Sequence, residues 1–295
     1  ARRAIDLASY PLPAEAERVK GVPEGELFHH EGWRCEEFAE TTREFCAMPP
    51  HPPHTRPPTR CCTTPTPSSS QAEFHRRAAG VYVPQQYVPG TAARIIICQD
   101  GHRYLDPEGE SRVTVVLDNM IAAGELEPTL ALFIRPGVPL PDEERTEKGL
   151  CPKGDVSPTD WERSFEYDSV SGKYGDMLIK ELLPFVEAEH GVTISSEPKD
   201  RLIMGHSSGG VASMAAGFTH PEAFGCVVSH CASYVNIRGA HQLPWAVRNS
   251  ERRDIRVLLL IGTNDNDNDH GNNQLGNEQL GAALGYAGYD STLII

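Results

Sequence analysis

Short apolar runs alternate with helix-like segments along the chain from Gly80 onward. After a first strand over 26–30, strands are expected over 81–83, 94–98, 129–134, 201–204, 224–229, 255–261 and 291–295. Helices are expected over 113–123, 176–190, 209–219 and 277–284. Apolar, β-branched strands that alternate with helices are typical of a largely parallel sheet. We therefore expect an α/β fold with a mostly parallel central sheet and helices on both faces.

The motif Gly-x-Ser-x-Gly occupies residues 205–209, directly after an expected strand and before an expected helix. Glycines at its first and last positions let the backbone turn sharply without a Cβ clash. Such a turn can hold a serine hydroxyl beside a base and amide donors, so we expect Ser207 to be a nucleophile. Two alternatives stay open, a plain connecting loop and, if the register of the turn slips, Ser208 as the nucleophile.

Three loops with polar residues follow expected strands, namely 99–102, 205–209 and 262–269. In parallel α/β sheets the chemistry lies at the carboxyl ends of the strands. We therefore expect these three loops to lie together at one edge of the sheet.

Several stretches besides the serine motif carry a family resemblance, namely Val81-Tyr82-Val83-Pro84, Gln99-Asp100-Gly101-His102, Arg163-Ser164-Phe165-Glu166-Tyr167-Asp168, Gly262-Thr263-Asn264-Asp265 and His270-Gly271-Asn272. Through these residues, the chain over 10–295, without 46–79, resembles the enterochelin-esterase/esterase D group of α/β-hydrolases. The resemblance implies an α/β-hydrolase fold and serine-dependent hydrolysis of carboxylic esters or related acyl bonds. It also implies that no metal and no organic cofactor takes part.

An acyl-enzyme mechanism needs amide donors for the oxyanion that forms when the serine attacks. The backbone N–H of Ser208 is the first expected donor, because it follows the nucleophile. The second is expected in the loop after the strand 94–98, from Asp100 or Gly101. We prefer Gly101, because glycine lets the backbone approach the substrate closely.

The expected acid of a catalytic triad is Asp265, which would orient a histidine and stabilise its cation. Asp267 is the alternative, because the loop 264–269 alternates Asn and Asp and leaves the register open. Such a loop also offers oxygen ligands for calcium, although its spacing does not fit an EF-hand. It could equally be a solvated turn, and we predict no metal site.

Three further residues are expected near the substrate. His102 follows the second oxyanion donor and could line the pocket. Arg163 and Glu166 are expected to form an ion pair with each other near the pocket rim, or to contact a polar substrate.

The triad histidine should follow the acid in the sequence, because α/β-hydrolases carry their triad in the order serine, acid, histidine. The last histidine of the chain is His270, which lies very close to the expected acid. We expect the catalytic histidine beyond Ile295, so that this chain is either a fragment, itself inactive, or carries an incomplete triad. The favoured function is a serine esterase acting on a small soluble ester. The alternatives are a non-catalytic binding protein of the same fold and an acyltransferase.

The region 46–79 interrupts the pattern, with eight of the 24 prolines between residues 49 and 67 and no acidic residue between Glu44 and Glu73. We interpret 1–45 as an N-terminal arm with the first strands and 80–295 as the α/β-hydrolase domain, incomplete at its C-terminus. The region 46–79 is then a low-complexity insert, expected to be disordered or not genuine.

The net charge of -14 argues against nucleic acid or an anionic membrane as a partner, because both need basic patches. No apolar run is long enough to span a bilayer. The eight cysteines are scattered without a Cys-x-x-Cys pair, which favours a reducing compartment such as the cytoplasm. The expected partner is a small-molecule ester, and the composition does not define an oligomeric state.

Overall fold

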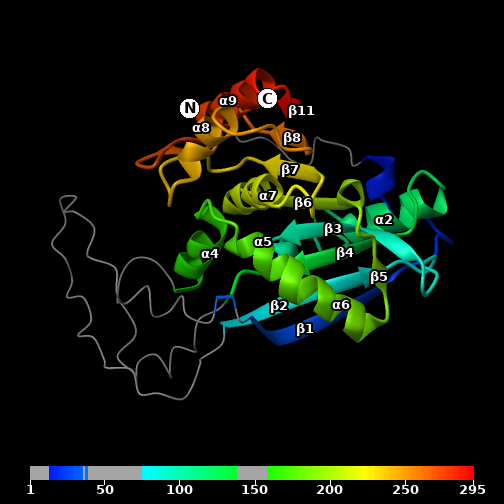
Figure 1. Cartoon of the computed structure of the whole chain (residues 1–295). Coiled ribbons are helices and arrows are strands. Elements are labelled where there is room, and N and C mark those ends of the chain that lie inside the picture. The colour runs from blue at the N-terminus through cyan, green and yellow to red at the C-terminus, as the bar shows by residue number, and fades with distance from the viewer. Residues whose placement is uncertain (1–12, 36, 39–74, 110, 138–157) are drawn as a thin grey trace, which may run out of the picture.

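The computed structural model of the chain describes residues 13–35, 37–38, 75–109, 111–137 and 158–295. These residues form a nine-stranded sheet with the order β1-β2-β4-β3-β6-β7-β8-β11 and with β5 joined to β3 (Figure 1). Its strands are β1 Glu26–Cys35, β2 His75–Val83, β3 Ala92–Gln99, β4 Thr129–Ile134, β5 Thr193–Ile194, β6 Arg201–His206, β7 Cys226–His230, β8 Arg256–Leu260 and β11 Asp290–Ile294. The pairings β1–β2 and β2–β4 are antiparallel, and the others are parallel. The sheet is thus mostly parallel, as expected.

The middle strands are apolar on both faces, because helices cover both sides of the sheet. In β4, Leu130 and Leu132 belong to the larger buried cluster, whereas Ala131 and Phe133 belong to a smaller one. Successive side chains of a strand point to opposite faces, so the two clusters lie on opposite sides of the sheet. Both faces are therefore buried, which confirms the expected two-sided covering.

The helices divide between these two clusters. Helix α2 packs on the smaller cluster, and α5 to α9 contribute to the larger one. The helices are α2 Val113–Ala122, α4 Pro158–Asp168, α5 Lys173–Met177, α6 Leu183–His190, α7 Ser208–Thr219, α8 Leu243–Arg248 and α9 Asn273–Tyr286. No helix in these ranges is long and apolar enough to cross a lipid bilayer.

The helix expected over 176–190 is not continuous. It begins at Lys173 in α5, passes through a π-helical segment Leu178–Leu182 and continues as α6. Pro184 stands in the first turn of α6. Because proline has no N–H to donate to a preceding carbonyl, the regular ladder is interrupted here and a wider π turn takes its place. Gly191 caps the C-terminus of α6 in the left-handed conformation, with φ of 61°.

The boundary of the expected insert differs from the structure at its C-terminal end. Strand β2 begins at His75, so the sheet includes the last residues of the range 46–79. The remaining residues of that range lie outside the described part of the chain. Strand β1 pairs along β2 and belongs to the same sheet. The interpretation of the insert therefore stays a prediction.

The parallel part of the sheet brings the candidate loops together. Strand β6 lies between β3 and β7, with Cys98 opposite Met204 and His206 opposite His230, and β8 follows β7 (Figure 1). All four strands run in the same direction, so their carboxyl ends meet at one edge. The residues after β3, β6 and β8 lie at that edge.

Candidate active site

Ser207 occupies a sharp turn between β6 and α7. Its backbone has φ of 58° and ψ of -125°, outside the regions that a residue with a Cβ normally adopts. A Cβ on Gly205 would lie 2.5 Å from the backbone carbonyl of Gly209, so residue 205 must be a glycine. The Ser207 N–H donates to the carbonyl of His230 at 3.0 Å. The surrounding contacts thus hold a strained serine in place, as in a nucleophile elbow.

The N-terminus of α7 offers a backbone donor beside this serine. Ser208 is the first residue of the helix, where N–H groups have no partner within the helix. The first hydrogen bonds into the turn start later, from Gly210 and Val211 to the carbonyl of Ser207. The Ser208 N–H is therefore available for an oxyanion.

The loop after β3 offers the second donor. The short 3-10 helix η3, Gly101–Arg103, follows Asp100, whose φ of 56° is left-handed. The Asp100 N–H donates to the Tyr167 hydroxyl at 3.3 Å, whereas Gly101 is the first residue of η3 and has no acceptor within it. A Cβ on Gly101 would lie 2.3 Å from the backbone of Phe133. Of the two donors that the sequence left open, the Asp100 N–H is engaged, whereas the Gly101 N–H has no acceptor among the residues that the structure describes.

Asp265 follows β8 in a half-buried position. Its Oδ1 accepts from the Asn266 N–H at 2.6 Å and from the Asn273 side chain at 3.0 Å, and the Cys231 thiol bonds the same carboxylate. Asp267 is exposed and lies in the small hairpin of β9 Asp267–Asn268 and β10 Gly271–Asn272. The local geometry thus distinguishes the two carboxylates, because only Asp265 is held by neighbouring side chains.

Histidines gather around the same edge. Partial loss of water around the imidazole rings lowers the pKa of His102, His206 and His230. Positive charge adds to this effect, chiefly Arg135 at His102 and Arg103 at His206. These imidazoles are therefore biased toward their neutral forms near pH 7.

These histidines do not assemble a triad. Across the described ranges, none of their imidazole rings hydrogen-bonds to the side chain of Ser207 or of Asp265. His270 is exposed, and its backbone bonds to Asn236 and to the side chain of Asn268. His102 is exposed on η3, directly after Gly101, and its place in a substrate pocket stays a prediction.

The expected ion pair between Arg163 and Glu166 does not form. Arg163 instead binds the Asp100 carboxylate, with Nη2 2.6 Å from Oδ2. Glu166 binds Arg77 of β2, and both of these side chains are fully buried. The two residues lie three positions apart on α4, but Arg163 meets an opposite charge from the loop after β3, and Glu166 meets one from β2. Glu166 is consequently inaccessible to a substrate.

Asp168 is a residue of this site that the sequence analysis missed. It is 1% exposed and accepts a hydrogen bond from Ser233 Oγ, 3.5 Å from Oδ1, and the hydroxyls of Ser208 and Ser164 lie close enough to lower its pKa. Burial raises the pKa of Asp168 to about 6, against the effect of these hydrogen bonds and of the Arg163 charge. Its only signal in the sequence is its place at the end of the stretch 163–168.

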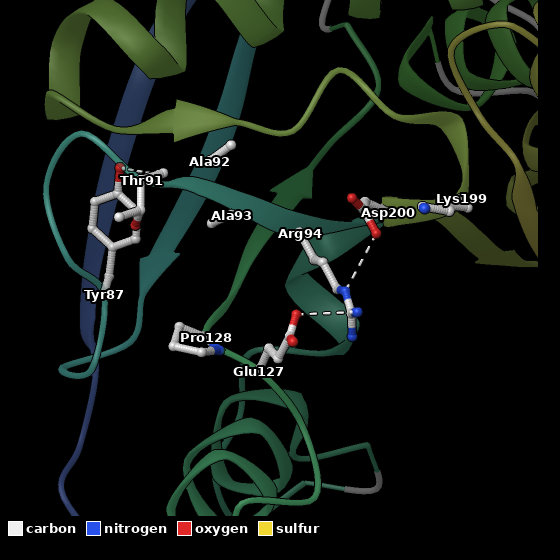
Figure 2. Close-up of a pocket in the computed structure, with 9 residues that line it drawn as sticks. All are labelled: Tyr87, Thr91, Ala92, Ala93, Arg94, Glu127, Pro128, Lys199 and Asp200. Carbon is white, nitrogen blue, oxygen red and sulfur yellow. Dashed lines mark hydrogen bonds and ion pairs between the residues drawn. The ribbon is translucent and has the colours of Figure 1, made fainter.

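A cavity of about 470 Å³ lies at the opposite edge of the sheet (Figure 2). There Arg94, at the start of β3, binds Glu127 at 3.1 Å and Asp200 at 3.3 Å. Because β3 advances about 3.3 Å per residue, this edge lies roughly 20 Å from Gly101. The cavity is therefore separate from the candidate active site. In the described part of the chain, no group of three or more His, Cys, Asp or Glu side chains could hold a metal ion.

Solved esterase structures share this fold. The ferric enterobactin esterase of Salmonella typhimurium has a TM-score of 0.62 at 16% identity, over 96% of this chain and 56% of its own. The ferulic acid esterase AmCE1/Fae1A of Anaeromyces mucronatus, in complex with ferulic acid, has a TM-score of 0.61 at 14% identity, over 96% and 87%. At these identities the likeness establishes the fold alone, which is the expected α/β-hydrolase fold. The chain spans a little over half the length of the enterobactin esterases that it resembles.

Sequence comparison reaches the family level. The protein YjcH of Bacillus subtilis, itself described as uncharacterized, is 23% identical over 187 residues, which are 63% of this chain and 67% of that protein. Residues 70–279 match the family described as "Putative esterase", and this match takes in both Ser207 and Asp265. Since the matched region is well over half of the chain, the protein belongs to the "Putative esterase" family.

Proposed function

We propose that the protein is a serine-dependent carboxylic ester hydrolase that acts on a small soluble ester through an acyl-enzyme at Ser207. The observation that carries this proposal is the strained turn of Ser207 between β6 and the N-terminus of α7. Membership of an esterase family supports the same class of reaction.

In the first step the Ser207 hydroxyl oxygen bonds to the acyl carbon while its proton passes to a histidine base. The Ser208 and Gly101 N–H groups stabilise the resulting oxyanion. The C–O bond to the alcohol then breaks, and the alcohol leaves with the proton from the histidine. Water, deprotonated by the same histidine, attacks the acyl-enzyme and releases the acid and the free Ser207 hydroxyl.

The role of Asp265 is to orient the histidine and stabilise its cation. Strand β11 pairs in parallel with β8, so its carboxyl end lies at the same edge as the Asp265 loop. A histidine in a segment that followed β11 would thus lie at the same edge as this loop.

The test is covalent labelling by a fluorophosphonate, together with turnover of p-nitrophenyl acetate, on the protein at its natural full length. Ser207→Ala should abolish both signals. Ser213→Ala is the matched control, because Ser213 lies in α7, the helix that follows Ser207, and its buried hydroxyl donates to the Gly209 carbonyl at 2.8 Å. Equal labelling of wild type and Ser207→Ala would refute the proposal, and loss in Ser208→Ala alone would assign the nucleophile to Ser208. A wild type that neither labels nor turns over would favour the binding-protein alternative.

The assignment of the acid is tested in the same assay. Asp265→Asn should lower kcat by about 10³- to 10⁴-fold, because the histidine loses its orienting carboxylate. Asp267→Asn should change kcat little, since Asp267 is exposed in the hairpin. The reverse result would move the acid to Asp267. Because the related Anaeromyces mucronatus enzyme binds ferulic acid, methyl ferulate is a suitable second substrate.

A further inference from the structure

Helix α4 presents three polar side chains to the two backbone donors of the candidate site. Arg163 and Tyr167 are four positions apart, so they lie on one face of the helix, and the Arg163 guanidinium carbon is 5.4 Å from the centre of the Tyr167 ring. Asp168 follows directly. The stretch 163–168 stood out in the sequence, yet the reaction proposed above assigns no role to it.

Arg163 holds the residue before Gly101 at two points. Its Nε lies 3.0 Å from Asp100 Oδ1, and its Nη2 lies 2.6 Å from Oδ2. The Asp100 side chain is 3% exposed and makes no capping bond to η3, so the guanidinium is its binding partner. A two-point pair between a guanidinium and a carboxylate fixes both the position and the orientation of the carboxylate.

Tyr167 holds the backbone of the same residue. Its buried hydroxyl accepts the Asp100 N–H at 3.3 Å. Asp100 itself has the left-handed φ of 56°, which an aspartate adopts only when its surroundings compensate for the strain. One helix thus holds the side chain and the amide of the residue that sets the direction of the Gly101 N–H.

Asp168 makes the corresponding contact with the other donor. The side chain of Ser208, whose backbone N–H is the first expected donor, lies close enough to the Asp168 carboxylate to lower its pKa, and Ser233 Oγ lies 3.5 Å from Oδ1 of the same carboxylate. Helix α4 is itself tied to the sheet, because Glu166 binds Arg77 of β2 through two buried hydrogen bonds. The helix is therefore a rigid link between the loop after β3 and the start of α7.

We propose that α4 positions the oxyanion hole, with Arg163 and Tyr167 acting on the Gly101 N–H through Asp100, and Asp168 acting on Ser208. This inference rests on the proposed esterase function and assigns these residues a positioning role in it. It replaces the expected substrate contact of Arg163, because the guanidinium already binds Asp100. Oxyanion donors must lie about 2.7–3.1 Å from the developing charge, and a displacement of about 1 Å can cost about 10²-fold in rate.

The test is a double-mutant cycle on the full-length protein, with kcat and KM measured for p-nitrophenyl acetate. Arg163→Met should lower kcat by about 10²-fold and leave KM nearly unchanged, because the oxyanion forms only in the transition state. Arg163→Lys should lie between Arg163→Met and wild type, since lysine keeps the charge but not the two-point geometry. Asp100→Asn tests the partner, because asparagine tolerates the left-handed conformation.

The double variant keeps the test valid if Arg163→Met fails to fold. Arg163→Met leaves the buried Asp100 carboxylate without its cation, whereas Arg163→Met with Asp100→Asn leaves no buried unpaired charge. If Arg163 acts through Asp100, the double variant should lose no more kcat than the worse single variant. Arg94→Met is the matched control, because Arg94 is likewise paired with carboxylates, those of Glu127 and Asp200 (Figure 2), but lies at the opposite edge of the sheet.

The outcomes separate this inference from the function on which it rests. No Ser207-dependent reaction in the wild type would overturn the proposed function and the positioning role with it. An active, Ser207-dependent wild type with unchanged kcat in Arg163→Met would overturn the positioning role alone. Losses of kcat that multiply in the double variant would also overturn the positioning role. A change confined to KM would overturn it too, and would indicate that Arg163 binds the substrate.

Discussion

The substitution Gly101→Ala tests the second oxyanion donor directly. A Cβ at residue 101 would lie 2.3 Å from the carbonyl carbon of Phe133 and 2.4 Å from its Cα. These are backbone atoms of a buried central strand, so they cannot give way as a flexible side chain would. Residue 101 must instead shift by about 1 Å to reach an ordinary contact distance. A donor moved that far from about 2.9 Å no longer makes a hydrogen bond.

The loss of one oxyanion donor costs about 2.7–4 kcal/mol of transition-state stabilisation, or about 10²- to 10³-fold in kcat. We expect this loss for Gly101→Ala with KM little changed. The assay is steady-state turnover of p-nitrophenyl acetate, with circular dichroism to verify that the variant is folded. Gly80→Ala is the matched control, because its Cβ would meet the same Phe133 side chain at an ordinary 3.5 Å.

A folded Gly101→Ala variant with wild-type kcat would refute the reasoning. It would mean that the Gly101 N–H is not an oxyanion donor or that the loop absorbs the methyl group without moving this amide. A loss of equal size in Gly80→Ala would show that general crowding around Phe133, rather than displacement of the donor, lowers the activity.

Two further predictions concern buried charge and are checked by urea denaturation. Arg77→Met or Glu166→Gln alone should cost about 3–5 kcal/mol of stability, because each leaves a buried charge uncompensated. The double variant should cost much less than the sum of the two, and additive costs would contradict the prediction. Burial raises the pKa of Asp168 from the ordinary 3.8 to about 6, so between these pH values the native state binds more protons than the unfolded state. The contribution of Asp168 to stability therefore falls as the pH rises through this range, and it is constant above it. Asp168→Asn should remove this pH dependence and should be more stable than the wild type at pH 7 by up to about 3 kcal/mol. If the stability of the wild type and of the variant rose in parallel from pH 4 to pH 6, the raised pKa of Asp168 would be contradicted.

Much of the fold could be predicted because its signals are local. The expected strand over 129–134 coincides with β4, since a short apolar run buried on both faces is itself a property of consecutive residues. The expected helix over 209–219 differs from α7 by one residue at its start. The serine turn was predictable for the same reason, because its two glycines and its serine lie within five positions.

Local patterns did not predict the helices correctly where a single residue interrupts a helix or where the helix is polar. Pro184 is visible in the sequence, yet the apolar periodicity of 176–190 continues through it, so the π turn before α6 was not foreseen. Helix α4 was missed as a helix, because its mean hydropathy is low and its polar residues serve distant partners. Its residues 163–168 could be noticed only through the family resemblance.

The sequence by itself determined the class of fold, the position of the candidate nucleophile and the loops that surround it, because each depends on residues close together in the chain. Only the tertiary structure decided which charges meet. Arg163 binds Asp100 from 63 positions away, and Glu166 binds Arg77 from 89 positions away, although Arg163 and Glu166 are near neighbours. The physical reason is the tertiary packing of α4, which places Glu166 against Arg77 of β2 and Arg163 against Asp100 after β3, and so makes a stretch of polar residues the proposed support of an oxyanion hole.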